Sequence, residues 1–140
     1  MIILDTNVLS EPLRPTPDGV AVRWLDAQEP GTLFITAITV AELHCGVELL
    51  PAGKRKKALK SALTDEVLPL FGDRVLAFDA QAAVAFGKLH AVRRAAGAPI
   101  SFADCAIAAI AQLHGFALAT RNQRDFEHLP IKLIDPWVGP

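Results

Sequence analysis

Short apolar runs alternate with longer segments of helical periodicity along the 140 residues of the chain. Each run is too short to be a helix, and an unbroken apolar run is typical of a strand buried on both faces of a sheet. Five strands are predicted in this way, at residues 2–4, 33–35, 75–78, 116–119 and 131–134. Because such strands alternate with helices, the sequence predicts an α/β fold with a doubly wound central parallel sheet. We expect residues 1–140 to form this single domain.

The segments between the strands have helical spacing and recognisable ends. Helices are predicted at about residues 18–28, 39–50, 54–70, 79–94 and 101–114. Two of them open with a capping-box pattern, so Thr39 and Ser101 are expected to be N-caps. Arg93 and Arg94 lie in the last turn of another helix, where positive charge complements the helix dipole.

Composition and charge narrow the class of protein. With 51% hydrophobic and 21% charged residues, the chain is expected to be globular. Its net charge is −1, so the chain lacks the excess of basic residues that is typical of proteins that bind nucleic acid without specificity. No basic region precedes the N-terminal apolar run, and polar residues interrupt the longest apolar stretch, 103–119. We therefore expect a cytoplasmic protein with no membrane contact. Cys45 and Cys105 lie in apolar helical patterns and are predicted to be small buried thiols.

Acidic and amide side chains gather where ligands bind in such a fold, beyond the carboxyl ends of parallel strands. Asp5 follows the first strand, Glu42 lies in the first turn of the helix after the second, and Asp104 lies in the first turn of its own helix. Asn122 and Asp125 follow the fourth strand. Their oxygens are the hard ligands that Mg²⁺ or Mn²⁺ prefers, and a cation would relieve the repulsion between crowded carboxylates. A divalent metal site is therefore predicted.

Each of these acids also has a purely structural interpretation. Asp5 could be the N-cap of a strand-to-helix turn, and Glu42 and Asp104 could close the two capping boxes. A cap and a metal ligand are compatible, because a first-turn side chain points out of the helix end. Three further polar residues lie close enough in the pattern to hold the carboxylates by hydrogen bonds: Thr6, Asn7 and Thr120.

Five segments together resemble the PIN-domain ribonuclease toxins of the VapC/FitB type. They are Leu4-Asp5-Thr6-Asn7-Val8-Leu9-Ser10-Glu11, Thr39-Val40-Ala41-Glu42-Leu43, Ala103-Asp104-Cys105-Ala106-Ile107-Ala108-Ala109-Ile110-Ala111, Ala119-Thr120-Arg121-Asn122 and Asp135-Pro136-Trp137. They span the whole chain in the order that the family keeps. The resemblance implies a PIN-like three-layer α/β/α fold whose central sheet has about five strands.

The resemblance also implies a function and partners. It implies an endoribonuclease that depends on Mg²⁺ or Mn²⁺ and cleaves single-stranded RNA, with Asp5, Glu42 and Asp104 matching the family's acidic ligands. It implies a homodimer, a cognate antitoxin of the VapB/FitA type, and binding of operator DNA only through that antitoxin. Many members of the family carry a fourth acid where this chain has Asn122, and Asp125 is a nearby substitute.

We expect the site residues to divide the work of phosphodiester hydrolysis. In this hypothesis Asp5 and Asp104 bind the metal directly, and Glu42 either binds it or orients the attacking water. Asn122 and Asp125 complete the outer coordination. Arg121 is interpreted either as a phosphate contact or as a solvated surface residue, and the basic run 54–57 either as an RNA guide or as a solvated helix start.

Two other classes of protein are compatible with a doubly wound sheet. A phosphorylation-controlled receiver domain would use Asp79, but it requires paired acids after the first strand and a lysine after the fifth. Here Thr6 follows Asp5, and Lys132 lies inside the predicted fifth strand. A binding module that keeps the fold without turnover is the third alternative. A metal-dependent cleavage assay separates it from the nuclease.

Overall fold

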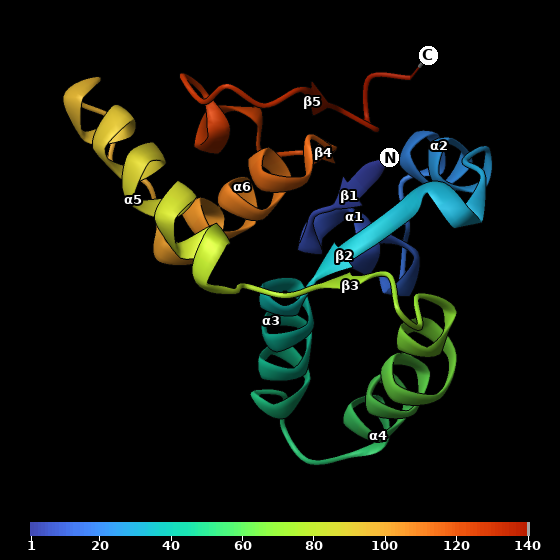
Figure 1. Cartoon of the computed structure of the whole chain (residues 1–140). Coiled ribbons are helices and arrows are strands. Elements are labelled where there is room, and N and C mark those ends of the chain that lie inside the picture. The colour runs from blue at the N-terminus through green and yellow to red at the C-terminus, as the bar shows by residue number, and fades with distance from the viewer. Residues whose placement is uncertain (140) are drawn as a thin grey trace.

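Five parallel strands form one sheet in the computed structural model, which describes residues 1–139 (Figure 1). The strands are β1 (Ile2–Leu4), β2 (Leu33–Thr36), β3 (Val75–Leu76), β4 (Ala117–Ala119) and β5 (Leu133–Ile134). Their order is β3-β2-β1-β4-β5, so the first strand lies in the centre of the sheet. The predicted number and parallel direction of the strands are confirmed. The two edge strands are shorter than their apolar runs, because Phe78 and Ile131 pack against the core instead of extending the ladder.

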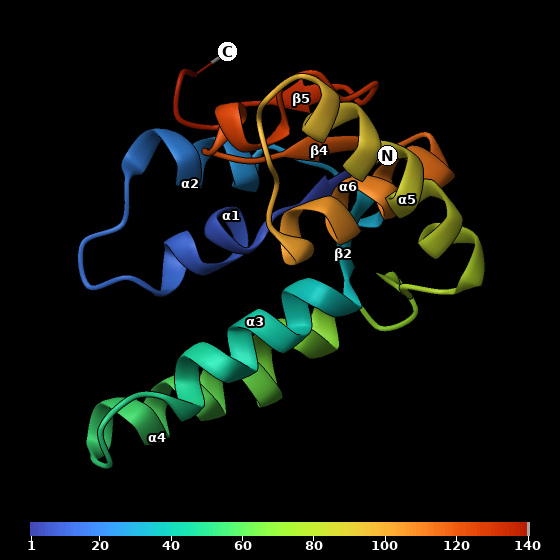
Figure 2. The same cartoon turned by 90° about the vertical axis from the view of Figure 1, so that its left-hand side faces the viewer.

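Six α-helices surround the sheet. They are α1 (Thr6–Ser10), α2 (Gly19–Asp26), α3 (Ala37–Glu48), α4 (Lys54–Ser61), α5 (Ala80–Ala95) and α6 (Phe102–His114). Figure 2 shows α3 and α4 lying side by side as an arm that projects from the sheet. Within residues 1–139 no helix is long and apolar enough to cross a membrane.

The N-caps of these helices agree with the sequence in all but one case. The side chains of Asp18, Asp79 and Ser101 accept backbone N–H groups at the starts of α2, α5 and α6, as expected. The prediction that Thr39 is the N-cap of α3 was wrong, and so was the placement of Glu42 in the first turn, since Glu42 is the sixth residue of this helix. Thr36 caps this helix and accepts the N–H of Thr39 at 3.1 Å, since the chain turns helical directly at the end of β2.

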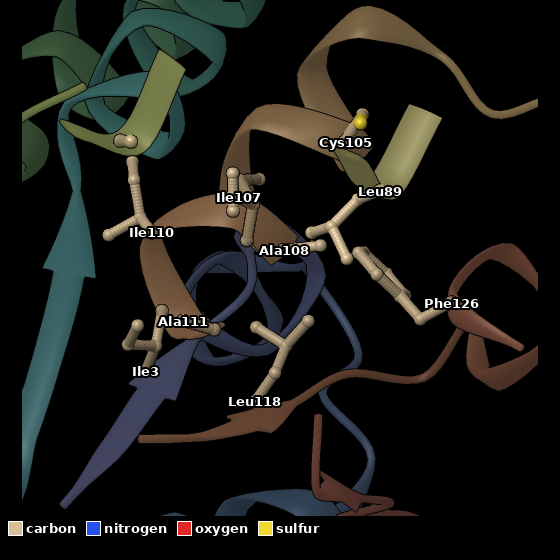
Figure 3. Packing of buried hydrophobic residues seen from close by; sticks show 11 residues of the cluster. Ile3, Leu89, Cys105, Ile107, Ala108, Ile110, Ala111, Leu118 and Phe126 are labelled. Atoms are coloured by element: carbon tan, nitrogen blue, oxygen red, sulfur yellow. The ribbon is translucent and has the colours of Figure 1, made fainter. Parts of the chain in front are cut away.

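Two hydrophobic clusters lie on opposite faces of the sheet. Consecutive residues of a strand point to opposite faces, so Ile3 belongs to one cluster and Leu4 to the other. Figure 3 shows the first cluster, in which α6 packs its fully buried segment 105–111 over β1 and β4. Five residues of that segment are alanine or cysteine, and small side chains let the helix approach the sheet closely. The three-layer α/β/α arrangement is therefore confirmed.

Arg93 has a role beyond its sequence prediction, and Cys45 differs from its prediction. Arg93 lies in the last turn of α5 as expected, but it is buried, and its guanidinium donates to three carbonyl oxygens, those of Ala98 (2.6 Å), Asp125 and Glu127. The side chain thereby also ties the end of α5 to the segment after β4. Cys45 is exposed, because it lies on the outer side of the projecting helix α3, whereas Cys105 is buried as expected.

Candidate functional site

Asp5 lies at the carboxyl end of the central strand and is 4% exposed. One carboxylate oxygen accepts the N–H of Thr6 at 2.8 Å and caps α1. The other oxygen accepts the Thr120 hydroxyl at 2.7 Å and the Asn7 amide at 3.3 Å. Burial raises the pKa of Asp5 despite these hydrogen bonds, and the charge of Glu42 raises it further. Asp5 is thus both the cap that the structural interpretation expected and a desolvated acid at the sheet edge.

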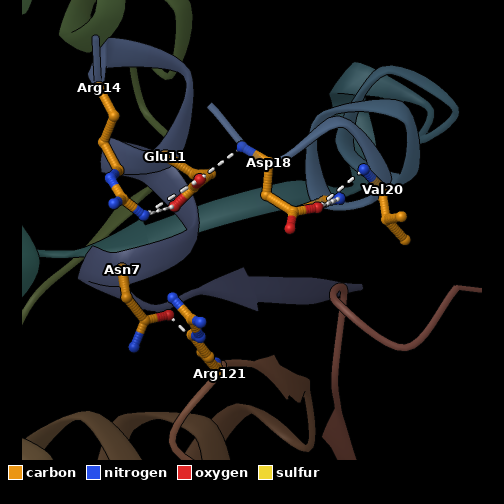
Figure 4. A network of polar contacts seen from close by, with 7 residues as sticks. Asn7, Glu11, Arg14, Asp18, Val20 and Arg121 are labelled. Atoms are coloured by element: carbon orange, nitrogen blue, oxygen red, sulfur yellow. Dashed lines mark hydrogen bonds and ion pairs between the residues drawn. The ribbon is translucent and has the colours of Figure 1, made fainter. Parts of the chain in front are cut away.

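The pairing of β1 with β4 brings Asp5 and Thr120 together across 115 positions of sequence. Leu4 is the register partner of Ala119, so the residue that follows each strand emerges at the same point. Asn7 reinforces this junction, because its side chain donates to Thr120 at 3.3 Å and accepts the N–H of Arg121 at 3.2 Å (Figure 4). The hydrogen bonds that we expected from Asn7 and Thr120 to the carboxylate are present.

Glu42 lies on α3, the helix that follows β2, and β2 is the neighbour of β1 in the sheet. Its side chain is exposed, and one carboxylate oxygen accepts the Thr6 hydroxyl at 2.7 Å. The same hydroxyl lies 3.4 Å from that of Thr39, a buried residue in the first turn of α3. Thr6 therefore connects α1 to α3 and orients Glu42, the role that the sequence predicted for it.

Asp104 approaches from the first turn of α6, where Ser101 caps the helix by accepting the Asp104 N–H at 3.2 Å. Burial raises the pKa of Asp104 to about 6, and the charges of Asp5, Asp125 and Glu42 add to the increase. Asp104 therefore lies within electrostatic reach of the other three acids.

Asn122 and Asp125 follow β4 on the short 3₁₀-helix Gln123–Phe126 and its N-terminal flank. Both side chains are exposed, and the backbone N–H of Asn122 donates to the Thr120 hydroxyl at 3.1 Å. Over residues 1–139 the Asp125 carboxylate forms no ion pair with Arg121 or Arg124. The simple surface pairing considered for Asp125 is therefore absent, and its charge acts on Asp104 instead.

These residues suit a divalent cation in their chemistry, although they do not form a closed cage. In the part of the chain that the structure describes, no three Asp, Glu, His or Cys side chains stand close enough together to enclose a metal ion. The donors are all oxygen atoms, as Mg²⁺ and Mn²⁺ require. Moreover, the raised pKa values of Asp5 and Asp104 reflect the cost of holding their charges without a counter-charge. A cation among them would remove that cost.

An ion pair between the buried Glu11 and the exposed Arg14, beside the site, was not predicted. Glu11 is 3% exposed, pairs with Arg14 at 3.2 Å and accepts the N–H of Asp18 at 2.7 Å (Figure 4). The only sequence signal was an acid directly after the apolar positions of α1. Arg14 also lines a groove of about 320 Å³ that begins at Thr6 and Glu42 and runs between α1 and the α3–α4 arm.

Comparison with known proteins identifies the family of this chain and several similar proteins. The family model described as PIN domain matches residues 2–132. The chain is 47% identical to the plasmid stability protein StbB of Pseudomonas syringae and 45% identical to the VapC ribonuclease Y4jK of Sinorhizobium fredii. It is 42% identical to the toxin FitB of Neisseria gonorrhoeae. Each match covers 98% of this chain and 98–99% of the relative.

Solved structures give the same result at the level of the fold. The structure described as FitAB bound to an IR36 DNA fragment superposes with a TM-score of 0.94 at 41% identity, covering 98% of this chain and 96% of that one. A toxin–antitoxin complex from Klebsiella pneumoniae superposes with a TM-score of 0.71 at 26% identity, covering 97% and 98%.

The raised pKa of Asp104 predicts how the stability of the metal-free protein changes with pH. The folded-state pKa is about 6, above the ordinary value of 3.8, so the folded protein holds this proton more tightly than the unfolded chain does. The resulting stabilisation is complete below the ordinary value and is lost as the pH rises through 6. The Asp104→Asn variant keeps a side chain of the same shape but has no carboxyl group to titrate. In chelator, urea unfolding should show the parent losing stability relative to this variant from about pH 4 to about pH 7. A constant difference would contradict the prediction.

Proposed function

Because this chain belongs to the PIN domain family, we propose that it is a metal-dependent endoribonuclease and the toxin of a toxin–antitoxin module. The observation that carries the proposal is that Thr6 links Asp5 and Glu42 by hydrogen bonds at the carboxyl end of β1, within electrostatic reach of Asp104. The printed descriptions of relatives as a ribonuclease and as a toxin support it, at more than 40% identity over nearly the full length of both chains.

The proposed reaction is hydrolysis of a phosphodiester bond in single-stranded RNA. When bound, Mg²⁺ or Mn²⁺ supplies Lewis-acid stabilisation of the phosphate and an activated water. Asp5 and Asp104 would hold the cation with their carboxylates. Glu42 has one oxygen held by Thr6 and an exposed side chain, so its other oxygen can accept a hydrogen bond from the attacking water. Asn7 and Thr120 keep the Asp5 carboxylate in a single orientation.

Asn122 and Asp125 are proposed to complete the outer part of the metal site. Asn122 offers a neutral carbonyl oxygen at the place where many members of the family carry an acid. Asp125 supplies charge, and its influence on the pKa of Asp104 supports a position within electrostatic reach. Arg93 holds the backbone of this segment in place, since its side chain donates hydrogen bonds to the carbonyl oxygens of Asp125 and Glu127.

The partners follow from the same family membership. We assign the chain a VapB/FitA-type antitoxin, contact with operator DNA only through that antitoxin, and a homodimeric, cytoplasmic toxin. The described complexes with antitoxin and with a DNA fragment support this assignment. Co-purification with the product of the neighbouring reading frame, and loss of RNA cleavage in that complex, would test it.

The receiver alternative finds no support. The Asp79 carboxylate accepts the N–H of Ala82 at 2.9 Å as the cap of α5, which gives it a structural role. A receiver function would also not explain the raised pKa values of Asp5 and Asp104.

Metal-dependent cleavage is the direct test of the proposed function. Purified protein, free of any partner, should cleave single-stranded RNA with Mg²⁺ or Mn²⁺ and stop when chelator is added. Asp104→Asn should lower the cleavage rate by more than the roughly 10- to 100-fold that loss of an outer partner costs, because an amide is a weaker ligand than a carboxylate.

The matched control is Asp73→Asn, which neutralises an exposed acid in the loop that precedes β3, away from the carboxyl edge. It should cleave at the parent rate. Cleavage that persists in chelator would eliminate the metal mechanism, and a folded, fully active Asp104→Asn would remove this residue from the site.

The contribution of Asp125 can be measured by titrating cleavage with Mg²⁺. Removing one charge from a cluster of carboxylates weakens its affinity for a cation. Asp125→Asn should therefore need about 10-fold more Mg²⁺ for half-maximal rate, at the lower end of the range known for outer partners of metal ligands. Asn122→Asp should partly restore the affinity in the double variant. If Asp125→Asn titrates like the parent, three acids and the Asn122 amide are the whole site.

A further inference from the structure

Arg121 lies at the edge of the acidic site on a fixed stretch of backbone. Its N–H donates to the Asn7 side chain at 3.2 Å (Figure 4). The hydroxyl of the preceding residue, Thr120, donates to Asp5. The Arg121 side chain passes over the indole ring of Trp137, with 5.3 Å between the guanidinium carbon and the ring centroid. Arg121 and Trp137, which come from two separate segments of the family resemblance, thus meet in the fold.

The guanidinium of Arg121 keeps its charge uncompensated. Within residues 1–139 the ion pairs join Arg14 to Glu11 and two lysines to Glu48, and none includes Arg121. Arg93 is buried and committed to backbone carbonyls. Arg121 is exposed, so the N–H groups along the edge of its guanidinium are available to a ligand.

Trp137 contributes the face of its ring. Its backbone N–H donates to the Asp135 side chain at 2.9 Å, and the ring packs against the second hydrophobic cluster, which fixes its position. The indole N–H is buried without an acceptor in the described part of the chain, so the polar group of this side chain is not in use. Among aromatic side chains, tryptophan offers the ring face that attracts a cation most strongly. The ring therefore orients the guanidinium.

An RNA strand needs such a cation at this place. The chain has a net charge of −1, and the site itself presents several carboxylates that repel phosphates. In the basic run 54–57, Lys56 pairs with Glu48, and Arg55 lines the groove on the α3 side of the site. Neither lies on the segment after β4, where Arg121 is the first residue beyond Thr120. A planar guanidinium with a free edge matches two phosphate oxygens at once.

We propose that Arg121, held over Trp137, binds a phosphate of the RNA strand next to the bond that the acidic site cleaves. The proposal rests on the ribonuclease function and names how that site takes its substrate. Arg121 binds substrate, whereas Trp137 is a positioning residue that acts through the stacked guanidinium.

Binding of a labelled single-stranded RNA oligonucleotide, followed by fluorescence anisotropy in chelator at low salt, tests the contact apart from cleavage. Arg121→Gln should raise the Kd about tenfold, as expected for one charge-assisted contact. It should also lower the slope of log K against log salt by about 0.7, the value for one phosphate on a single strand. The matched control is Arg124→Gln, which removes the same charge from an exposed residue three positions away. It should bind nearly as the parent does.

Substitutions of Trp137 test the positioning role. Trp137→Leu should weaken binding in the parent and have no further effect in Arg121→Gln, whereas Trp137→Phe, which keeps a ring face, should restore most of the affinity. In Mg²⁺, Arg121→Gln should raise KM with little change in kcat. Circular dichroism establishes that each variant is folded, and equal additive losses in both backgrounds would assign Trp137 to structure alone.

The outcomes separate this inference from the proposed function. Equal Kd values for Arg121→Gln and Arg124→Gln overturn the phosphate contact while leaving the ribonuclease intact. The predicted binding pattern in a protein that never cleaves RNA would refute the ribonuclease and keep the contact. No RNA binding by the parent overturns both. Unchanged RNA affinity with lost binding of polyglutamate would assign Arg121 to an acidic protein partner and overturn the proposal.

Discussion

Burial of carboxylates at one edge of the sheet, to which their mutual repulsion adds, is the constraint on which the rest of the structure depends. Asp5 is almost completely buried, and Asp104 is raised to a pKa of about 6 by burial and by its acidic neighbours. A protein that holds acids in this way gives up stability at neutral pH unless a positive charge joins them. The arrangement is therefore informative, because folding alone does not favour it.

The starts of three helices help to hold these acids in place. Asp5 caps α1, Ser101 caps the helix that carries Asp104, and Thr36 caps the helix that carries Glu42. Parallel strands end at the same edge, so α1 and α3 begin there after β1 and β2, whereas α6 follows α5. The caps of α1 and α6 place Asp5 and Asp104 at helix starts, and Glu42 lies in the second turn of α3. The hydroxyls of Thr6 and Thr120 then fix two carboxylates by hydrogen bonds of 2.7 Å. Stability and function thus share the same few polar residues.

The sequence was informative where structure depends on local pattern. Apolar runs located the strands, and the acids after them, together with Thr6 and Thr120, were recognised because a parallel sheet collects its carboxyl ends. Strand order was not predictable, since pairing of β1 with β4 joins residues about a hundred positions apart. Arg93 was missed for the same reason: its burial depends on carbonyls 32 and 34 positions away. The stacking of Arg121 on Trp137 likewise requires the whole fold.

The central claim is that the acids of the site lack a compensating positive charge and bind a cation. Calorimetric titration of the metal-free protein with Mn²⁺ near pH 6 tests this claim most directly. The account predicts saturable binding with release of protons, because the cation favours the ionised form of Asp104, whose pKa is about 6. Proton release is read from the dependence of the heat on buffer ionisation, and both binding and release should be lost or strongly weakened in Asp104→Asn. Absence of binding by the parent, or equal binding by a folded Asp104→Asn protein, would contradict the account.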